Sequence, residues 1–135
     1  MHIEGACHCG EITFRAEVDP NQVIICHCSD CQVLTGSPYR SLVPALEGTF
    51  KLTSGSPKNY LRIADYGVER AQTFCPECGT PIYGAPANDV ELKCVGIRVG
   101  SIKQKHQLTP NKQIWCRSAL NWVQDLSDLP KSDGQ

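Results

Sequence analysis

Hydrophobic and polar residues alternate most regularly between positions 11 and 18. The even positions are apolar, and the odd positions are polar or charged. A period of two is typical of a β-strand that buries one face and exposes the other to water. Gly10 permits a tight turn before this strand, and the Asp-Pro-Asn run at 19–21 indicates a turn after it.

Shorter apolar runs bounded by turn residues predict further strands. They lie at residues 23–25, 39–43, 49–52, 58–63, 68–74, 81–83, 91–99 and 113–116. One helical turn is expected where residues 28–31 start it and Gly36 ends it, and a second at 118–123 with Trp122 as an apolar anchor. No longer segment has a period of 3.6 residues, so the sequence predicts a mostly β protein with many short strands.

Composition and charge exclude several classes of partner. The formal net charge is −1 and the lysines and arginines are scattered, so we expect no nucleic acid partner. No segment approaches the roughly 20 apolar residues that cross a bilayer, and no export signal is recognisable, so we expect no membrane partner and a cytoplasmic protein. The length of 135 residues fits a single domain, expected over residues 1–126, with a loose polar tail at 127–135.

Nine cysteines are a high number for this length, and seven of them fall into three short motifs. The motifs are an N-terminal pair (Cys7 and Cys9), a central trio (Cys26, Cys28 and Cys31) and a second pair (Cys75 and Cys78). An odd total without an export signal does not favour a disulfide scaffold, whereas these spacings are typical of metal ligands. Cys94 and Cys116 lie outside the motifs and are expected to be small buried apolar residues.

The spacing allows two divisions of the seven thiols. In the first, the N-terminal pair joins the second pair in a four-thiol site, and the central trio forms a three-thiol site. In the second, Cys28 and Cys31 join the second pair in a zinc ribbon, which leaves three thiols over. We favour the first because it uses all seven, but spacing alone leaves both open. Four thiolates close the tetrahedral shell of zinc, whereas three leave one position for water or substrate.

The cysteine motifs and their neighbours resemble the glutathione-dependent formaldehyde-activating enzyme family, also called the centromere-protein-V-like family. The matching segments are Gly5-x-Cys7-x-Cys9-Gly10, Cys26-His27-Cys28-Ser29-x-Cys31 with Thr35-Gly36-Ser37, Phe74-Cys75-x-x-Cys78-Gly79-Thr80, and Val99-Gly100-Ser101-Ile102 with Pro110, Ile114-Trp115 and Trp122. They run from about residue 3 to residue 123. The resemblance implies a β-tent fold of twisted antiparallel sheets and the first division of the thiols, with one structural zinc and a second zinc on the central trio.

The resemblance also implies an activity, the reversible addition of glutathione to formaldehyde, which is classed as a carbon–sulfur lyase reaction. A thiol held at a three-thiolate zinc would be ionised and placed beside a small aldehyde, so Cys26, Cys28 and Cys31 are candidate catalytic residues. The first hypothesis is therefore a zinc-dependent carbon–sulfur lyase that acts on a small thiol, such as glutathione, and a small aldehyde. Alternatives are a non-catalytic zinc-binding module with a structural or binding role, and a thiol-based redox or metal-buffering protein.

Two further questions concern the surroundings of the central trio. It could instead be a second structural site, with His27 or Cys94 as its fourth ligand. Three thiolates make a zinc shell net negative, so nearby cations would help a further anionic ligand to bind. The candidate cations are Arg40, Arg98, Lys103 and Arg117.

Overall fold

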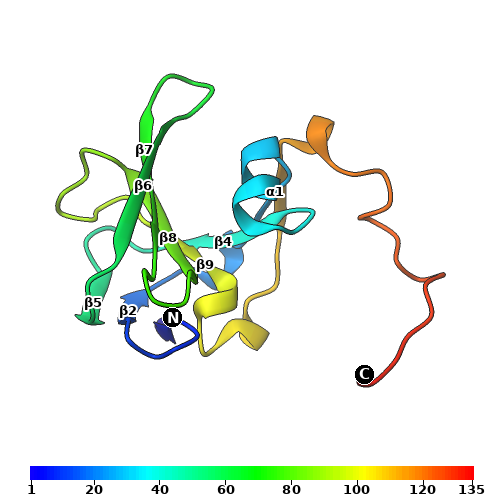
Figure 1. Ribbon diagram of the computed structural model, residues 1–135, viewed down its shortest axis with the longest axis horizontal. Coiled ribbons are helices and arrows are strands. Elements are labelled where there is room, and N and C mark those ends of the chain that lie inside the picture. Colours follow the sequence, from blue (N-terminus) through cyan, green and yellow to red (C-terminus); the bar gives the residue numbers. More distant parts are fainter.

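The computed structural model describes residues 1–135 and contains ten strands with one α-helix. The strands are β1 (His2–Ala6), β2 (Thr13–Glu17), β3 (Ile24–Cys26), β4 (Arg40–Pro44), β5 (Lys51–Ser54), β6 (Lys58–Ile63), β7 (Glu69–Phe74), β8 (Pro81–Pro86), β9 (Gly96–Arg98) and β10 (Lys112–Ile114). The helix is α1 (Ser29–Thr35), and short 3-10 turns lie at η1 (Pro20–Gln22), η2 (Val99–Ser101), η3 (Lys105–Gln107) and η4 (Cys116–Ser118). The mostly β class predicted from the sequence is confirmed (Figure 1).

The strands form two sheets. A three-stranded sheet has the order β1-β2-β5, and a seven-stranded sheet has the order β10-β3-β4-β9-β8-β7-β6. Neighbouring strands are antiparallel, except that β10 runs parallel to β3 at one edge of the larger sheet. That pair brings the late residues 112–114 beside residues 24–26, at the start of the central cysteine motif.

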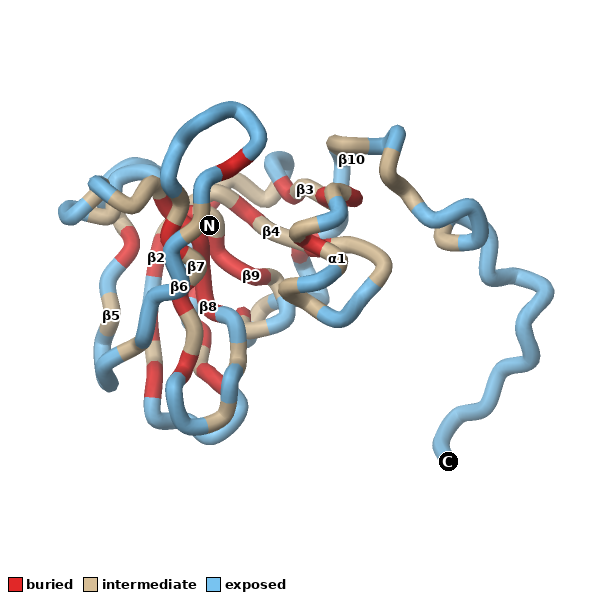
Figure 2. The backbone as a smooth tube through the Cα atoms, turned by 45° about the horizontal axis from the view of Figure 1, so that its top comes forward, coloured by how far each residue is buried: buried red, intermediate tan, exposed pale blue.

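One hydrophobic core joins the two sheets. Phe14 of β2 stacks on Phe50 with ring centroids 5.5 Å apart, and Phe50 in turn packs against Tyr83 of β8 at 4.8 Å. The alternation predicted at 11–18 is confirmed, because its apolar side chains are all buried in this core. Figure 2 shows buried residues on the strands of both sheets, whereas the segment beyond β10 is largely exposed.

The sequence did not predict β1, and the reason is a small residue on its buried face. Gly5 lies in the middle of the strand, where a Cβ atom would overlap the ring of Phe14 and the carbonyl oxygen of Ser101. A glycine in that position weakens the hydrophobic alternation that marks a strand. Because the Phe14 ring leaves room only for a glycine at this position, the strand lacks the alternation by which it could be recognised in the sequence.

The strand predicted at 91–99 is wrong over its first half, because only residues 96–98 form β9. The carboxylate of Asp89 accepts hydrogen bonds from the backbone N–H groups of Lys93, at 3.0 Å, and Cys94, at 2.6 Å. Leu92 has a φ of 54°, in the left-handed region. A side chain that satisfies successive backbone donors in this way favours a turn over a strand.

The chain end differs from the prediction in one respect. A single turn is present near Trp122, with a hydrogen bond from the N–H of Val123 to the carbonyl of Leu120 at 3.1 Å. Trp122 is nevertheless 55% exposed, so the prediction that it anchors this segment is wrong. Residues 127–135 are exposed throughout. No helix of the chain has both the length and the apolar character of a membrane span.

Candidate metal centres and the adjoining cavity

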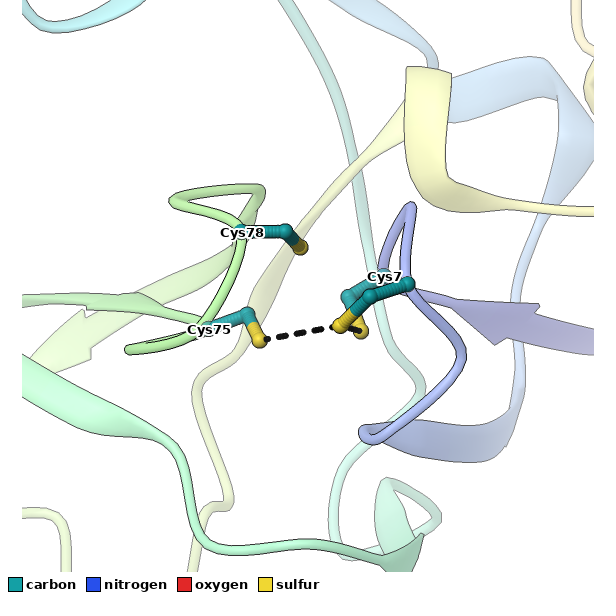
Figure 3. Close-up of side chains that lie close together, drawn as sticks. Cys7, Cys75 and Cys78 are labelled. Carbon is teal, nitrogen blue, oxygen red and sulfur yellow. Dashed lines mark hydrogen bonds between the residues drawn. The ribbon is translucent and has the colours of Figure 1, made fainter.

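The N-terminal pair and the second pair meet, and we call their four thiols the four-thiol group. Their sulfur atoms all lie within 4.8 Å of one another. The Sγ atoms of Cys7 and Cys9 are 3.4 Å apart, and those of Cys9 and Cys75 are 3.7 Å apart. In Figure 3, Cys75 and Cys78 project from one loop toward Cys7 on another.

Two similar loops present these thiols. In the first, the N–H of Cys7 donates to the carbonyl of Ile12, and in the second the N–H of Cys75 donates to the carbonyl of Thr80, each at 3.0 Å. Each loop contains a glycine with positive φ, at 85° for Gly10 and 74° for Gly79, which a larger side chain would disfavour. The N–H of His8 donates to the Thr80 hydroxyl at 3.0 Å and links the two loops directly.

The donor set of the four-thiol group fits zinc. Sulfur atoms at about 2.3 Å from a tetrahedral zinc are about 3.8 Å from one another, close to the separations found here. Hydrogen bonds also favour the ionised forms of Cys7 and Cys78, whereas those with neighbouring thiols raise the pKa of Cys9. The N–H of Ile12 donates to Cys7 at 3.2 Å, and the hydrogen bond with the Thr80 hydroxyl lowers the pKa of Cys78 to about 5.

The central trio forms the second group, which we call the three-thiol group. Its sulfur atoms likewise lie within 4.8 Å of one another, where β3 ends and α1 begins. Cys28 caps the helix, because its sulfur accepts the N–H of Cys31 at 3.3 Å. Gly36 ends the helix with φ 62°, as predicted. Cys26 and Cys31 are buried and Cys28 is half-buried, so the group opens to one side.

The seven thiols therefore lie in the two groups of the first division. The hydrogen bond between Cys26 and Cys31 lowers the pKa of Cys26 and raises that of Cys31, while burial raises the pKa of Cys28. Three soft sulfur donors fit zinc with one position open. Whether either group binds a metal stays a prediction.

Neither proposed fourth ligand belongs to the three-thiol group. The His27 ring is buried, and its Nε2 lies 2.8 Å from the side-chain oxygen of Gln113. Cys94 is exposed in the turn before β9, and Cys116 is exposed at the start of η4. The prediction that these two cysteines are buried is wrong, since both occupy turns at the surface.

A cavity of about 220 Å³ contains the three thiols. Leu42, Ile114 and Trp115 form apolar parts of its wall, and Arg62 closes another side through an ion pair with Asp30 at 2.5 Å. Trp115 has a φ of 57°, an unfavourable value for a large side chain and one that occurs often at ligand sites. The three-thiol group is thus the floor of a partly apolar cavity.

A hydrogen bond connects the segment after β10, which contributes Trp115 to this wall, to α1. The side-chain amide of Gln32 donates to the carbonyl of His27 at 2.8 Å and to the carbonyl of Ser118 at 2.9 Å. The guanidinium of Arg117 lies 4.8 Å from the centre of the Trp115 ring. Sequence reasoning missed the hydrogen bond between Gln32 and Ser118 because these residues are 86 positions apart in the chain.

Of the four candidate cations, Arg40 and Arg98 are buried and lie near the three-thiol group. Their charges act on the thiol of Cys31, whose ionised form they favour. Lys103 instead pairs with Glu4 at 2.9 Å. Arg117 is occupied at the Trp115 ring. The two buried arginines share a neutral acceptor, Gln72, which no motif or pattern in the sequence marks as a site residue.

Fold and site define a thiol-rich β protein with one closed cysteine group and one that opens into a cavity. Residues 2–118 match the family described as glutathione-dependent formaldehyde-activating enzyme. The chain therefore belongs to that family, and the resemblance recognised in the sequence is confirmed.

The chain is also similar to two individual proteins, one in sequence and one in structure. A Schizosaccharomyces pombe protein named as an uncharacterized lyase is 29% identical over 85 residues, which make up 63% of this chain and 58% of that relative. The match therefore spans little more than half of the relative. A crystal structure of a Rhodobacter sphaeroides protein has a TM-score of 0.61 with 18% identity, covering 82% of this chain and 98% of that one. This second likeness supports the fold alone.

Proposed function

We propose that the protein is a zinc-dependent carbon–sulfur lyase that cleaves or forms the adduct of a small aldehyde with a low-molecular-weight thiol. The observation that carries the proposal is the cavity above the three-thiol group. A purely structural cysteine site is closed, whereas a catalytic one keeps a position open. The family description names glutathione and formaldehyde, which are the first thiol and aldehyde to test. The similar protein named as a lyase agrees with this reaction class.

In this proposal Cys7, Cys9, Cys75 and Cys78 hold a structural zinc, and Cys26, Cys28 and Cys31 hold the second zinc. The second zinc would supply a Lewis acid that lowers the pKa of a bound substrate thiol. Cysteine ligands need to stay reduced, which suits the cytoplasmic location expected from the sequence. The domain would span residues 1–126.

The residues of the cavity have separate tasks. Cys28, the most accessible thiol of the group, marks the side from which substrate enters. Leu42 and Trp115 exclude water from the reacting carbon and strengthen electrostatic interactions there. When the adduct breaks into thiolate and aldehyde, its hydroxyl group loses a proton. Two carboxylates line the cavity, and since Asp30 is paired with Arg62, Asp65 is the acceptor for that proton in this proposal.

The direct test is calorimetric titration of glutathione into fully zinc-loaded protein, followed by NMR measurement of adduct formation with formaldehyde. We expect binding and turnover by the wild-type protein and neither by Cys28→Ser. Binding without turnover, or no binding of any thiol, would favour the non-catalytic module. Full turnover by Cys28→Ser would remove the three-thiol group from the mechanism.

A further inference from the structure

A pair of buried arginines lies beside the three-thiol group without any acidic partner. Arg40 is 6% exposed and Arg98 is 8% exposed, and neither takes part in an ion pair of the protein. Both guanidinium groups donate to the same neutral atom, the Oε1 of Gln72, at 3.0 Å from Arg40 and 2.7 Å from Arg98. The Nε–H of each arginine is buried with no acceptor. Buried charges are normally paired, and no carboxylate of the protein pairs with these two.

The electrostatics of the pair also favour an anion. Burial, and then the charge of Arg40, lowers the pKa of Arg98 to about 9. Guanidinium groups carry a positive charge in proteins, so the two repel one another across a single oxygen atom. A negatively charged group beside them would relieve that repulsion.

The sheet makes specific room for Arg98. Gly84 lies in the interior of β8, where a glycine weakens a strand. A Cβ atom there would lie 2.7 Å from the Nη2 of Arg98 and 3.4 Å from the Oε1 of Gln72. Gly84 therefore leaves the space in which the guanidinium meets its acceptor.

The arginines open into a cavity of their own, of about 370 Å³. Leu34 and Phe74 contribute apolar walls, and Arg40, Arg98 and Gln72 supply the polar groups. A mostly apolar cavity with a few convergent polar groups is the usual form of a small-molecule site.

This arginine cavity is next to the cavity of the three-thiol group along the same strands. On β4, Arg40 lines the arginine cavity and Leu42, two residues on, lines the thiol cavity. On the β6–β7 pair, the partners Tyr60 and Gln72 line the first, and the partners Arg62 and Arg70 line the second. Residues two apart in a strand share a face and lie about 7 Å apart. The two cavities are therefore neighbours on one face of the sheet.

The donor geometry of the pair suits a carboxylate. The two guanidinium groups of Arg40 and Arg98 are buried side by side, and no carboxylate of the protein forms an ion pair with either of them. The two oxygens of a carboxylate match the paired donors of a guanidinium group.

We infer that Arg40 and Arg98 form a carboxylate subsite. The preferred thiol substrate then carries a carboxylate that lies in the arginine cavity while its sulfur lies in the cavity of the three-thiol group. This inference rests on the proposed function for the identity of the ligand as a thiol. The carboxylate displaces no hydrogen bond of the chain, because the guanidinium N–H groups that do not donate to Gln72 receive it.

Two thiols that differ in one terminal group test the inference without any mutation. The probes are 6-mercaptohexanoate and 6-mercaptohexanamide, which have the same number of non-hydrogen atoms and flexible chains long enough to span the cavities. Calorimetry on zinc-loaded wild-type protein should give a dissociation constant at least about tenfold lower for the carboxylate. Equal affinities, with binding still lost in Cys28→Ser, would overturn the subsite and leave the lyase proposal standing.

Substitutions in the arginine cavity then test which residues cause the preference for the carboxylate probe. Arg98→Met, Arg40→Met and Gly84→Ala should each reduce the carboxylate preference to about twofold or less. Arg15→Met is the matched control, because Arg15 is exposed on β2 and its loss removes the same charge. Thermal melting verifies that each variant is folded. A preference that survives in folded Arg40→Met and Arg98→Met would overturn the inference.

A thiol-free probe separates the subsite from the proposed reaction. Binding of 6-(methylthio)hexanoate that depends on Arg98, in a protein that binds no free thiol and turns over no adduct, would support the carboxylate subsite and refute the lyase proposal. Failure of both carboxylate probes to bind, while glutathione is still turned over, would refute the subsite and support the lyase.

Discussion

The two cysteine groups use similar ligands in different architectural settings. The four-thiol group joins loops whose thiols are far apart in sequence, with Cys9 and Cys75 separated by 66 positions. The three-thiol group is confined to six consecutive residues at a strand–helix junction. The first therefore constrains the fold of the whole chain, whereas the second adds little cross-linking and leaves room above its sulfurs.

The two groups also differ in the elements that surround their thiols. Backbone hydrogen bonds and the Thr80 hydroxyl hold the four thiols between two similar loops, with Cys7 and Cys75 buried and Cys9 exposed. The three thiols face a cavity whose walls come from β4, β6, β7 and the segment after β10. The comparison teaches that the number of thiols alone does not predict whether a cysteine group has a structural or a catalytic role. We propose that the elements facing the thiols determine that role.

The largest expected effect follows from opening the closed group. Cys78→Ser should lower the melting temperature by more than about 10 °C, or abolish folding, because structural zinc contributes directly to the folding free energy. Circular dichroism and metal analysis measure both quantities. A folded Cys78→Ser protein with unchanged zinc content would show that the four-thiol group is not the structural centre.

Graded metal removal should separate the two groups in one sample. A chelator should first extract the zinc of the three-thiol group with the fold intact, because that site has fewer protein ligands and one coordination position left open. The second equivalent should leave only as the circular dichroism signal is lost. Release of both equivalents in a single step together with unfolding would contradict the distinction.

Opening the other group should affect function more than stability. Cys28→Ser is expected to lose one zinc equivalent and all lyase activity while its melting temperature changes by less than about 5 °C, since the site closes no long loop. Metal analysis, thermal melting and the adduct assay give these three values. A large loss of stability in Cys28→Ser would make the three-thiol group structural as well.

The smallest effect is expected outside both groups. Cys94→Ser and Cys116→Ser should keep two zinc equivalents and wild-type melting, because both thiols are exposed and belong to neither group. They are matched controls for the serine substitutions above. A loss of zinc in either variant would show that the groups exchange ligands in solution.

Much of the fold can be predicted from local hydrophobic patterns and from the spacing of the motifs. The alternation at 11–18, the strand at residues 58–63 and the helix end at Gly36 all follow from neighbouring residues, and all three are present in the structure. The grouping of the thiols was favoured for a simple reason, since one division used every cysteine in the motifs.

The remaining features depend on contacts between distant residues. β1 was missed because Gly5 yields space to Phe14, and β9 was overextended because Asp89 captures two backbone donors ahead of it. The arginine pair converges on Gln72 from two different strands, with Gly84 on a third giving it space. No pattern within a single segment of the sequence could have shown such a convergence.

The parallel pairing of β10 with β3 means that the three-thiol cavity is completed late in synthesis of the protein. The residues of the two four-thiol loops have all been made once Thr80 is added, but the wall of the three-thiol cavity requires Trp115, 35 residues later. At about 5–20 residues per second, those residues take about 2–7 s to add. During that interval the central trio has been made and its cavity wall has not, so its thiols lack the cover that they have in the folded protein.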